Sequence, residues 1–161
     1  KTKTNKIASI WSVLETIPDP EIPVLSIVDL GIVRNAAISE TGIPEITITA
    51  TYTGCPAMDF IATSIRMGLA ASGFSEIKII SSISPAWTTD WMSEEGKRKL
   101  KEYGIAPPQT LSDRPGLTNV IHCPHCNSIN TKVISEFGST ACKALYQCND
   151  CKEPFDYFKC H

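Results

Sequence analysis

The sequence predicts a small α/β (α+β) domain, a three-strand mixed sheet with flanking helices, followed by a cysteine-rich ribbon domain. Apolar residues recur at helical spacing in two segments, and short apolar or alternating segments lie between and after them. Six of the seven cysteines fall in the last quarter of the 161 residues, which marks a change of architecture. We therefore divide the chain into a domain at 1–105, a proline-containing linker at 106–119 and a ribbon at 120–161.

The first elements are a helix and a hairpin. Apolar side chains at Ile7, Ile10, Leu14 and Ile17 predict an amphipathic helix that Pro18 must end. Strands are predicted at 32–39 and 45–53 with a turn at 41–44 between them, and the second alternates apolar side chains with threonines. Two strands joined by so short a turn form a hairpin.

A second helix is predicted from the residues after Pro56 to about Ser72, and a third strand at 77–83. A strand, a helix and a strand in sequence imply a crossover that makes the third strand parallel to a neighbour. A loop with Trp87 and Trp91 follows, and then a short helix that Ser93 caps and Gly104 closes.

Charge and hydropathy exclude two classes of partner. The formal net charge of −2 gives no electrostatic footprint for nucleic acid. No apolar run approaches the roughly 18 residues that span a bilayer, and the first residues lack the apolar stretch of a signal peptide. We expect a cytoplasmic protein. Thiols in the cytoplasm stay reduced, so paired cysteines there are metal ligands rather than disulfides. The sequence leaves a homodimer open.

Two Cys-x-x-Cys pairs predict a metal site in the ribbon. Each pair offers two thiolates, and two pairs on facing turns complete a tetrahedral shell, so we expect structural zinc at Cys123, Cys126, Cys148 and Cys151. A segment of about 40 residues buries too little apolar surface to fold without help, so the metal supplies much of its folding energy. A rubredoxin-like iron site, a cluster and a redox dithiol are the alternatives.

The remaining cysteines and histidines of this segment are surplus to a four-coordinate site. Cys142 and Cys160 are candidate secondary ligands for a transferred metal, with burial in the core as the alternative. His122 and His125 are expected in a solvated loop.

Cys55 stands alone in the first domain, between Gly54 and Pro56 at the predicted start of the second helix. The helix dipole and the unpaired amides there are expected to lower the pKa of its thiol; simple packing beneath the loop is the alternative. No histidine precedes His122, so a Cys-His pair within this domain is excluded and a metal-ligand role is favoured. Glu21 and Asp29 are candidate carboxylate partners of the thiol.

Several motifs together resemble the PaaD (PaaJ) family, a branch of the SufT-like iron–sulfur assembly domains. They are the Asp-Pro-Glu-Ile-Pro segment at 19–23, the Asp-Leu-Gly segment at 29–31, the Thr-Gly-Cys-Pro segment at 53–56, the tryptophan loop at 84–91, and the block from Phe137 to Cys160. The match spans nearly the whole chain, and the tryptophan loop and the C-terminal block are specific to this branch.

The resemblance implies a SufT-like domain with a C-terminal zinc ribbon, acting as an accessory component of the multicomponent di-iron monooxygenase that epoxidises phenylacetyl-CoA. Its expected role is non-catalytic: delivery or insertion of iron or an iron–sulfur cluster, held transiently, into the oxygenase or reductase subunits. The resemblance makes Cys55 the reactive cysteine, with Glu21 and Asp29 as neighbours.

Two other functions are kept open. A structural adaptor would dock the oxygenase through a loop with Trp87 and Trp91 and would carry no transferable metal. A thiol redox protein would use the Cys-x-x-Cys pairs.

Overall fold

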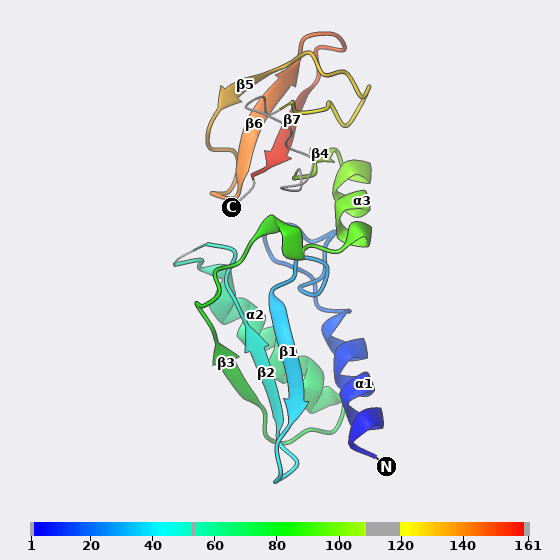
Figure 1. Cartoon of the computed structure of the whole chain (residues 1–161), viewed down its shortest axis with the longest axis vertical. Coiled ribbons are helices and arrows are strands. Elements are labelled where there is room, and N and C mark those ends of the chain that lie inside the picture. Colours follow the sequence, from blue (N-terminus) through cyan, green and yellow to red (C-terminus); the bar gives the residue numbers. More distant parts are fainter. Residues whose placement is uncertain (1, 53, 109–119, 160–161) are drawn as a thin grey trace. The chain divides into compact units, whose positions relative to one another are not determined.

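The computed structural model describes residues 2–52, 54–108 and 120–159, which pack as two compact units (Figure 1). The first unit holds the residues up to Trp87 together with 91–93, and the second holds 88–90 and the residues from Glu94 onward. Within the described residues, no helix is both long and apolar enough to cross a membrane.

The first unit is built on a three-stranded sheet in the order β1-β2-β3. Strands β1 (Val33–Ile38) and β2 (Pro44–Ile48) pair antiparallel, whereas β2 and β3 (Lys78–Ser81) pair parallel. The mixed sheet, the hairpin and the parallel third strand predicted from the sequence are thereby confirmed.

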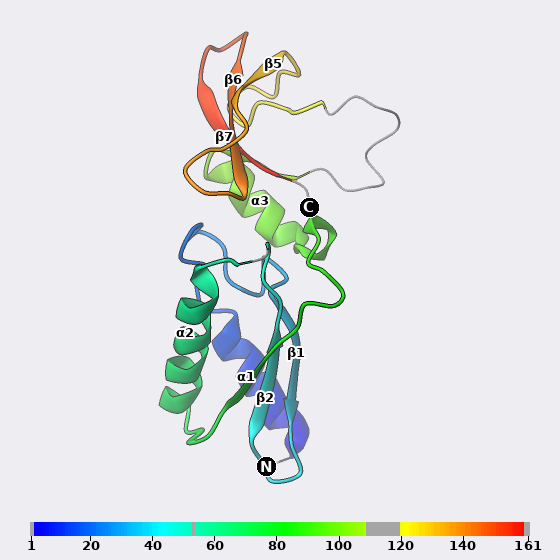
Figure 2. The same cartoon turned by 90° about the vertical axis from the view of Figure 1, so that its left-hand side faces the viewer.

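Two helices complete this unit. Helix α2 (Ala57–Ala71) lies across one face of the sheet, and α1 (Lys3–Leu14) runs beside β1 and against α2 (Figure 2). Alternate residues of β2 point into the core, so Ile46 and Ile48 are fully buried. They share the core with the apolar stripe of α2, which includes Ile61 and Ile65. Burial of these stripes is the main force that holds the helices on the sheet.

Strand β2 ends earlier than the alternation predicted. It was expected to run to residue 53, but pairing stops at Ile48, and the chain bends at residues 51 and 52. The amide of Cys55 then donates to the carbonyl of Tyr52. Tyr52 therefore lies in a loop at the end of the sheet rather than on the strand.

The long connection from α1 to β1 is part of the core. Leu25, Ile27 and Leu30 are almost fully buried. The amide of Asp19 donates to the carbonyl of Leu25, and the amide of Ile27 donates to that of Ile17. This connection is thus held by its own backbone hydrogen bonds, which gives its acidic side chains defined positions.

The second unit contains a four-stranded sheet in the order β4-β7-β6-β5. Three strands are antiparallel neighbours: β5 (Thr131–Ser135), β6 (Lys143–Cys148) and β7 (Pro154–Phe158). Helix α3 (Glu94–Glu102) leads into β4 (Ile105–Ala106), which pairs parallel with β7. The first residue of the predicted linker, Ala106, therefore belongs to this sheet.

Candidate metal sites

The four cysteines of the two Cys-x-x-Cys pairs meet in one cluster, with all four Sγ atoms within 4.8 Å of one another. The Sγ atoms of Cys123 and Cys151 are 3.7 Å apart, and those of Cys126 and Cys148 are 3.6 Å apart. A tetrahedral ion with metal–sulfur bonds of about 2.3 Å requires sulfurs about 3.8 Å apart. The cluster thus has the dimensions of a four-thiolate metal site.

The two pairs lie on matching turns. The amide of Cys123 donates to the carbonyl of Ser128, and that of Cys148 donates to the carbonyl of Glu153, in each case five residues on. The residue after each second cysteine, Asn127 or Lys152, has a left-handed backbone with φ of 63° or 67°. Each turn therefore presents its two thiols to the same side.

Backbone amides of the second turn also point at the sulfurs. The amide of Cys151 lies 3.5 Å from the Sγ of Cys148. This contact, together with the amide of Asp150, lowers the pKa of Cys148 to about 7. Burial and contacts with the other sulfurs raise the pKa of Cys126 and Cys151, so Cys148 ionises before either of them.

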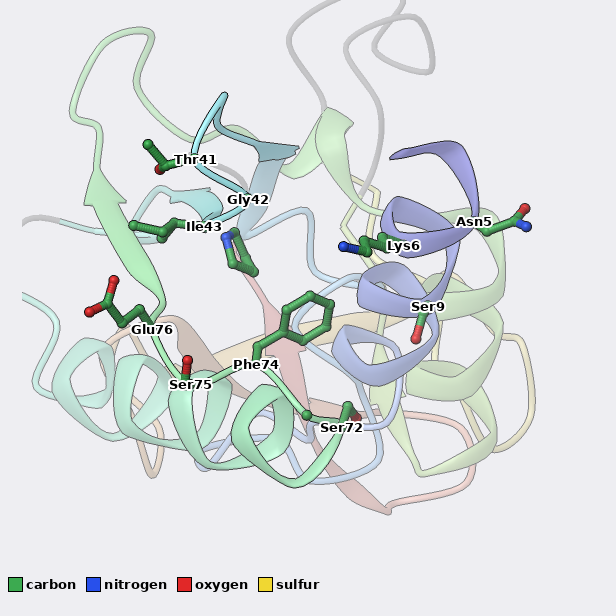
Figure 3. A pocket seen from close by; sticks show the side chains of 12 residues that line it. Asn5, Lys6, Ser9, Thr41, Gly42, Ile43, Ser72, Phe74, Ser75 and Glu76 are labelled. Atoms are coloured by element: carbon green, nitrogen blue, oxygen red, sulfur yellow. The ribbon is translucent and has the colours of Figure 1, made fainter. Parts of the chain in front are cut away.

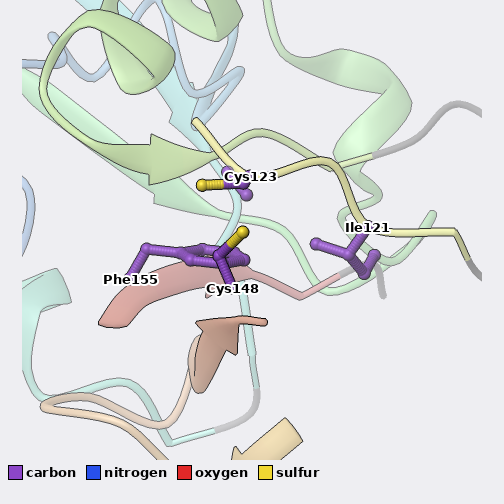
Figure 4. Packing of buried hydrophobic residues seen from close by; sticks show 5 residues of the cluster. Ile121, Cys123, Cys148 and Phe155 are labelled. Carbon is purple, nitrogen blue, oxygen red and sulfur yellow. The ribbon is translucent and has the colours of Figure 1, made fainter. Parts of the chain in front are cut away.

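Two sets of contacts hold the cluster in place. Cys123 and Cys148 are buried in the small core of this unit, beside Phe155 (Figure 4). Asp150 of the second turn accepts hydrogen bonds from Ser128 and Asn130, which follow the first turn. The two turns are therefore joined by side-chain hydrogen bonds as well as by the facing thiols.

Cys142, the other described cysteine of this segment, is not part of the cluster. Cys142 is buried and its Sγ lies 3.0 Å from the hydroxyl of Thr140, which agrees with a packing role. Cys160 lies outside the described residues. His122 and His125 are exposed, as expected for a solvated loop. A secondary metal site at Cys142 and Cys160 stays a prediction.

Cys55 is half-buried and lies just before α2, as the sequence predicts. The predicted lowering of its thiol pKa is wrong. Burial raises the pKa of the Cys55 thiol above its ordinary value, and the charges of Glu21 and Asp19 raise it further. The amide of Ala57 at the start of α2 lowers the pKa, as the helix dipole predicts, and the hydrogen bond with Tyr52 lowers it too, yet the raising contributions outweigh both. The thiol is therefore protonated at neutral pH.

Glu21 is connected to Cys55 through Tyr52. The Tyr52 hydroxyl donates to Oε1 of Glu21 at 3.2 Å and also hydrogen-bonds with the Cys55 thiol. Burial, the thiol and the carboxylate all raise the pKa of Tyr52, so the phenol keeps its proton. The structure thus brings one thiol, one phenol and one carboxylate together.

Asp19 positions this group, and sequence reasoning missed it. One carboxylate oxygen of Asp19 accepts from the amides of Glu21 at 2.9 Å and Ile22 at 2.8 Å, which fixes the direction of Glu21. Tyr52 was missed as well, because the alternation assigned it to the strand. The one signal for it was its position three residues before Cys55.

Asp29 has a local structural role. Its carboxylate accepts from the amide of Ser26, and its own amide donates to the Ser26 hydroxyl, a reciprocal pair like a capping box. The carboxylate also accepts from the hydroxyl of Ser93. These bonds join the turn at 26–31 to residue 93. A role for Asp29 as a ligand beside Cys55 stays a prediction.

The tryptophan loop is not the exposed surface that we expected. Trp87 is only 4% exposed, and its indole N–H donates to the carbonyl of Leu30 at 2.8 Å. Trp91 is half-buried, with the guanidinium of Arg34 3.5 Å from its ring centroid. The ring of Trp87 packs in the core and is not exposed in this conformation, and docking through this loop stays a prediction.

A separate cavity of about 610 Å³ lies at the opposite end of the first sheet, between the start of α1, the β1–β2 turn and the segment after α2 (Figure 3). Phe74 and Lys6 reach into it among several hydroxyl side chains. None of the candidate residues lines this cavity. The candidate chemistry of this unit is thus confined to the end that carries Cys55.

Comparisons with known proteins match both parts of the chain. Residues 7–74 match the family described as iron-sulfur cluster assembly protein, and residues 107–159 match the PaaD zinc beta ribbon domain. A protein of Escherichia coli K12, named as a putative subunit of 1,2-phenylacetyl-CoA epoxidase, is 50% identical over 155 residues, covering 96% of this chain and 93% of that protein.

Two shorter relatives match a little over half of this chain. An Fe-S protein maturation auxiliary factor of Porphyromonas gingivalis is 39% identical, over 56% of this chain and 87% of its own length. A crystal structure of domain of unknown function DUF59 from Bacillus anthracis aligns with a TM-score of 0.57 and 28% identity, over 61% of this chain and 93% of that one.

Proposed function

The chain belongs to the PaaD family of 1,2-phenylacetyl-CoA epoxidase components, and from this membership we propose that it matures its partner proteins by delivering iron or an iron–sulfur cluster. The observation that carries the proposal is the group of Cys55, Tyr52 and Glu21. All three lie within the segment that matches the iron-sulfur cluster assembly description.

In this proposal Cys55 is the transfer ligand. A thiolate is a good ligand for iron, and a carboxylate beside it supplies a second, harder donor. The negative charges of Glu21 and Asp19 near the thiol attract a cation. A half-buried thiol at the end of a unit is protected from bulk solvent yet reachable by a partner.

The four-cysteine cluster holds a structural zinc ion in this proposal. The fit of the sulfur spacing to a tetrahedral shell supports a four-coordinate ion, and four thiolates leave no position open for a substrate. The ion then stabilises the second unit, whose own core is small.

The oxygenase and reductase components of the epoxidase are the proposed partners, and the chain itself is proposed to catalyse no reaction. Its place in the cell is proposed to be the cytoplasm, with its partners. The name of the Escherichia coli relative, which makes it part of such an enzyme, motivates this choice.

The test is anaerobic iron, zinc and sulfide analysis of the intact chain and of Cys55→Ser, followed by transfer to the metal-free partner proteins. We expect one zinc in both proteins, and transferable iron in the intact chain alone. Equal activation of the partner by Cys55→Ser would contradict a transfer role.

An adaptor without transferable metal is the second candidate, because the second unit exposes large apolar side chains. Four lie on or near β5: Ile129, Val133, Ile134 and Phe137 are each 47–69% exposed. Exposed apolar groups gathered along an edge strand are typical of contact surfaces. A pull-down separates the two functions: an adaptor binds assembled epoxidase in fixed ratio, whereas a maturation factor prefers the metal-free partner.

A further inference from the structure

The Tyr52 hydroxyl is a hydrogen-bond partner of both the thiol of Cys55 and the carboxylate of Glu21. It donates to Oε1 of Glu21 at 3.2 Å and makes a hydrogen bond with the thiol on its other side. Glu21 is held from behind, because Asp19 accepts a hydrogen bond of 2.9 Å from its backbone amide. All of these residues belong to the first unit.

This arrangement satisfies both candidate ligands without a metal ion. A phenol has a single O–H: Tyr52 donates it to the carboxylate of Glu21, and its hydrogen bond with the sulfur lowers the pKa of Cys55. Two ligand atoms of one ion lie within about 4 Å of each other, because each is about 2.0–2.3 Å from the metal. An ion bound to both groups would use the sulfur and the carboxylate oxygen that the hydroxyl now contacts, so these hydrogen bonds would have to break first.

We propose that Tyr52 is a positioning residue that keeps this site closed, and that one divalent iron ion binds Cys55 and Glu21 together only after the hydroxyl has turned away. The inference rests on the proposed role of Cys55 and adds how that site is regulated. In binding, the thiol gives its proton to water as the sulfur–iron bond forms, and the Tyr52–Glu21 hydrogen bond breaks. Iron stays divalent, so no oxidant is required.

The donors also favour a single ion over a preformed cluster. Iron–sulfur clusters are held by several thiolates, whereas Cys55 is the one cysteine among the first 122 residues. A thiolate with a carboxylate suits one iron ion of intermediate softness.

Cobalt(II) is the probe for this inference, since its thiolate complexes absorb in the near ultraviolet. The full chain, with its four-cysteine cluster loaded with zinc, is titrated with cobalt(II) without oxygen, as intact protein, Tyr52→Phe and Cys55→Ser. Cys55→Ser gives the background to subtract. We expect Tyr52→Phe to bind about tenfold more tightly, because no hydrogen bond has to be broken first.

Two further variants separate a positioning role from a general effect on the fold. Removal of the hydroxyl in Tyr103→Phe, an exposed tyrosine of the second unit, is expected to change nothing. In a Glu21→Gln background we expect weaker binding and less than a twofold effect of Tyr52→Phe, because the hydroxyl then no longer competes with the ion for a carboxylate. A structural effect of the hydroxyl would be the same in both backgrounds.

The outcomes also separate this inference from the proposed function. Cys55-dependent cobalt binding that is unchanged or weaker in Tyr52→Phe overturns the closed-site inference and leaves Cys55 as a ligand. Absence of Cys55-dependent binding from the intact chain, Tyr52→Phe and Glu21→Gln alike overturns both. Circular dichroism of each variant checks that the fold is retained.

Discussion

The Tyr52 hydroxyl donates a hydrogen bond to Oε1 of Glu21, 3.2 Å away and 31 residues earlier in the chain. This bond joins the loop before α2 to the connection between α1 and β1. Because Tyr52 also contacts the Cys55 thiol, the carboxylate and the thiol share one hydrogen-bond partner. The ionisation of Cys55 and the stability of the first unit both depend on how this end of the unit is built.

Cys55 should be a slow nucleophile at neutral pH. Burial and the neighbouring acids raise the pKa of its thiol above the ordinary value of 9.0, so the thiolate forms only at higher pH. Alkylation of Cys55 by iodoacetamide, followed by mass spectrometry of the labelled peptide, should rise with pH and reach its midpoint above 9. A midpoint below 8 would contradict this prediction and support the dipole effect.

Asp19→Ala should lower the free energy of unfolding of the first unit by about 2–3 kcal/mol, because two backbone amides lose a charged acceptor. Asp19 is 5% exposed, so water does not readily replace it. Asp59→Ala is the matched control: this exposed acid in the first turn of α2 should cost only about 0.5 kcal/mol. Urea denaturation followed by tryptophan fluorescence measures both, and equal losses would contradict the assigned role.

Gly31→Ala should destabilise the first unit more than Gly42→Ala. Both glycines have positive φ, 73° and 86°, so each alanine costs about 1 kcal/mol of backbone strain. A Cβ on Gly31 would also lie 2.5 Å from the carbonyl oxygen of Trp91, whereas one on Gly42 meets no atom within 4 Å. Thermal unfolding should separate the variants by several degrees, and similar melting temperatures would mean that the loop shifts freely.

Lys152→Gly should stabilise the second unit by up to about 1 kcal/mol, because glycine adopts the left-handed backbone after the second Cys-x-x-Cys pair without strain. The gain is reduced by the entropy that glycine loses on folding. Asn127→Gly, at the matching position of the first pair, should change the stability less, since asparagine tolerates this conformation. Denaturation of the zinc-loaded proteins measures the difference, and a larger gain at Asn127 would contradict it.

Removal of the metal should unfold the second unit and leave the first folded. The core of the second unit is small, so the metal supplies a large share of its stability. Chelation followed by limited proteolysis should therefore yield a resistant N-terminal fragment. Survival of the whole chain would show that the metal is dispensable for folding.

Local patterns in the sequence were enough for the elements and for the four-cysteine cluster. The alternation in 45–48 and the stripe of α2 reflect faces that must be buried, and each is repeated within one element. The two Cys-x-x-Cys pairs carry their own geometry, because two ligands on one turn need no distant residue to face the same way.

Only the tertiary structure decided the chemistry around Cys55 and the place of the tryptophans. Tyr52 meets Glu21, and Trp87 meets Leu30, across 31 and 57 residues. Such contacts depend on where strand β2 ends and on how the connection before β1 folds back. The spacing of apolar residues within one helix or strand does not predict either of these. The pKa of Cys55 likewise follows from burial and from charges that come from another segment, so the dipole of its own helix could not predict it.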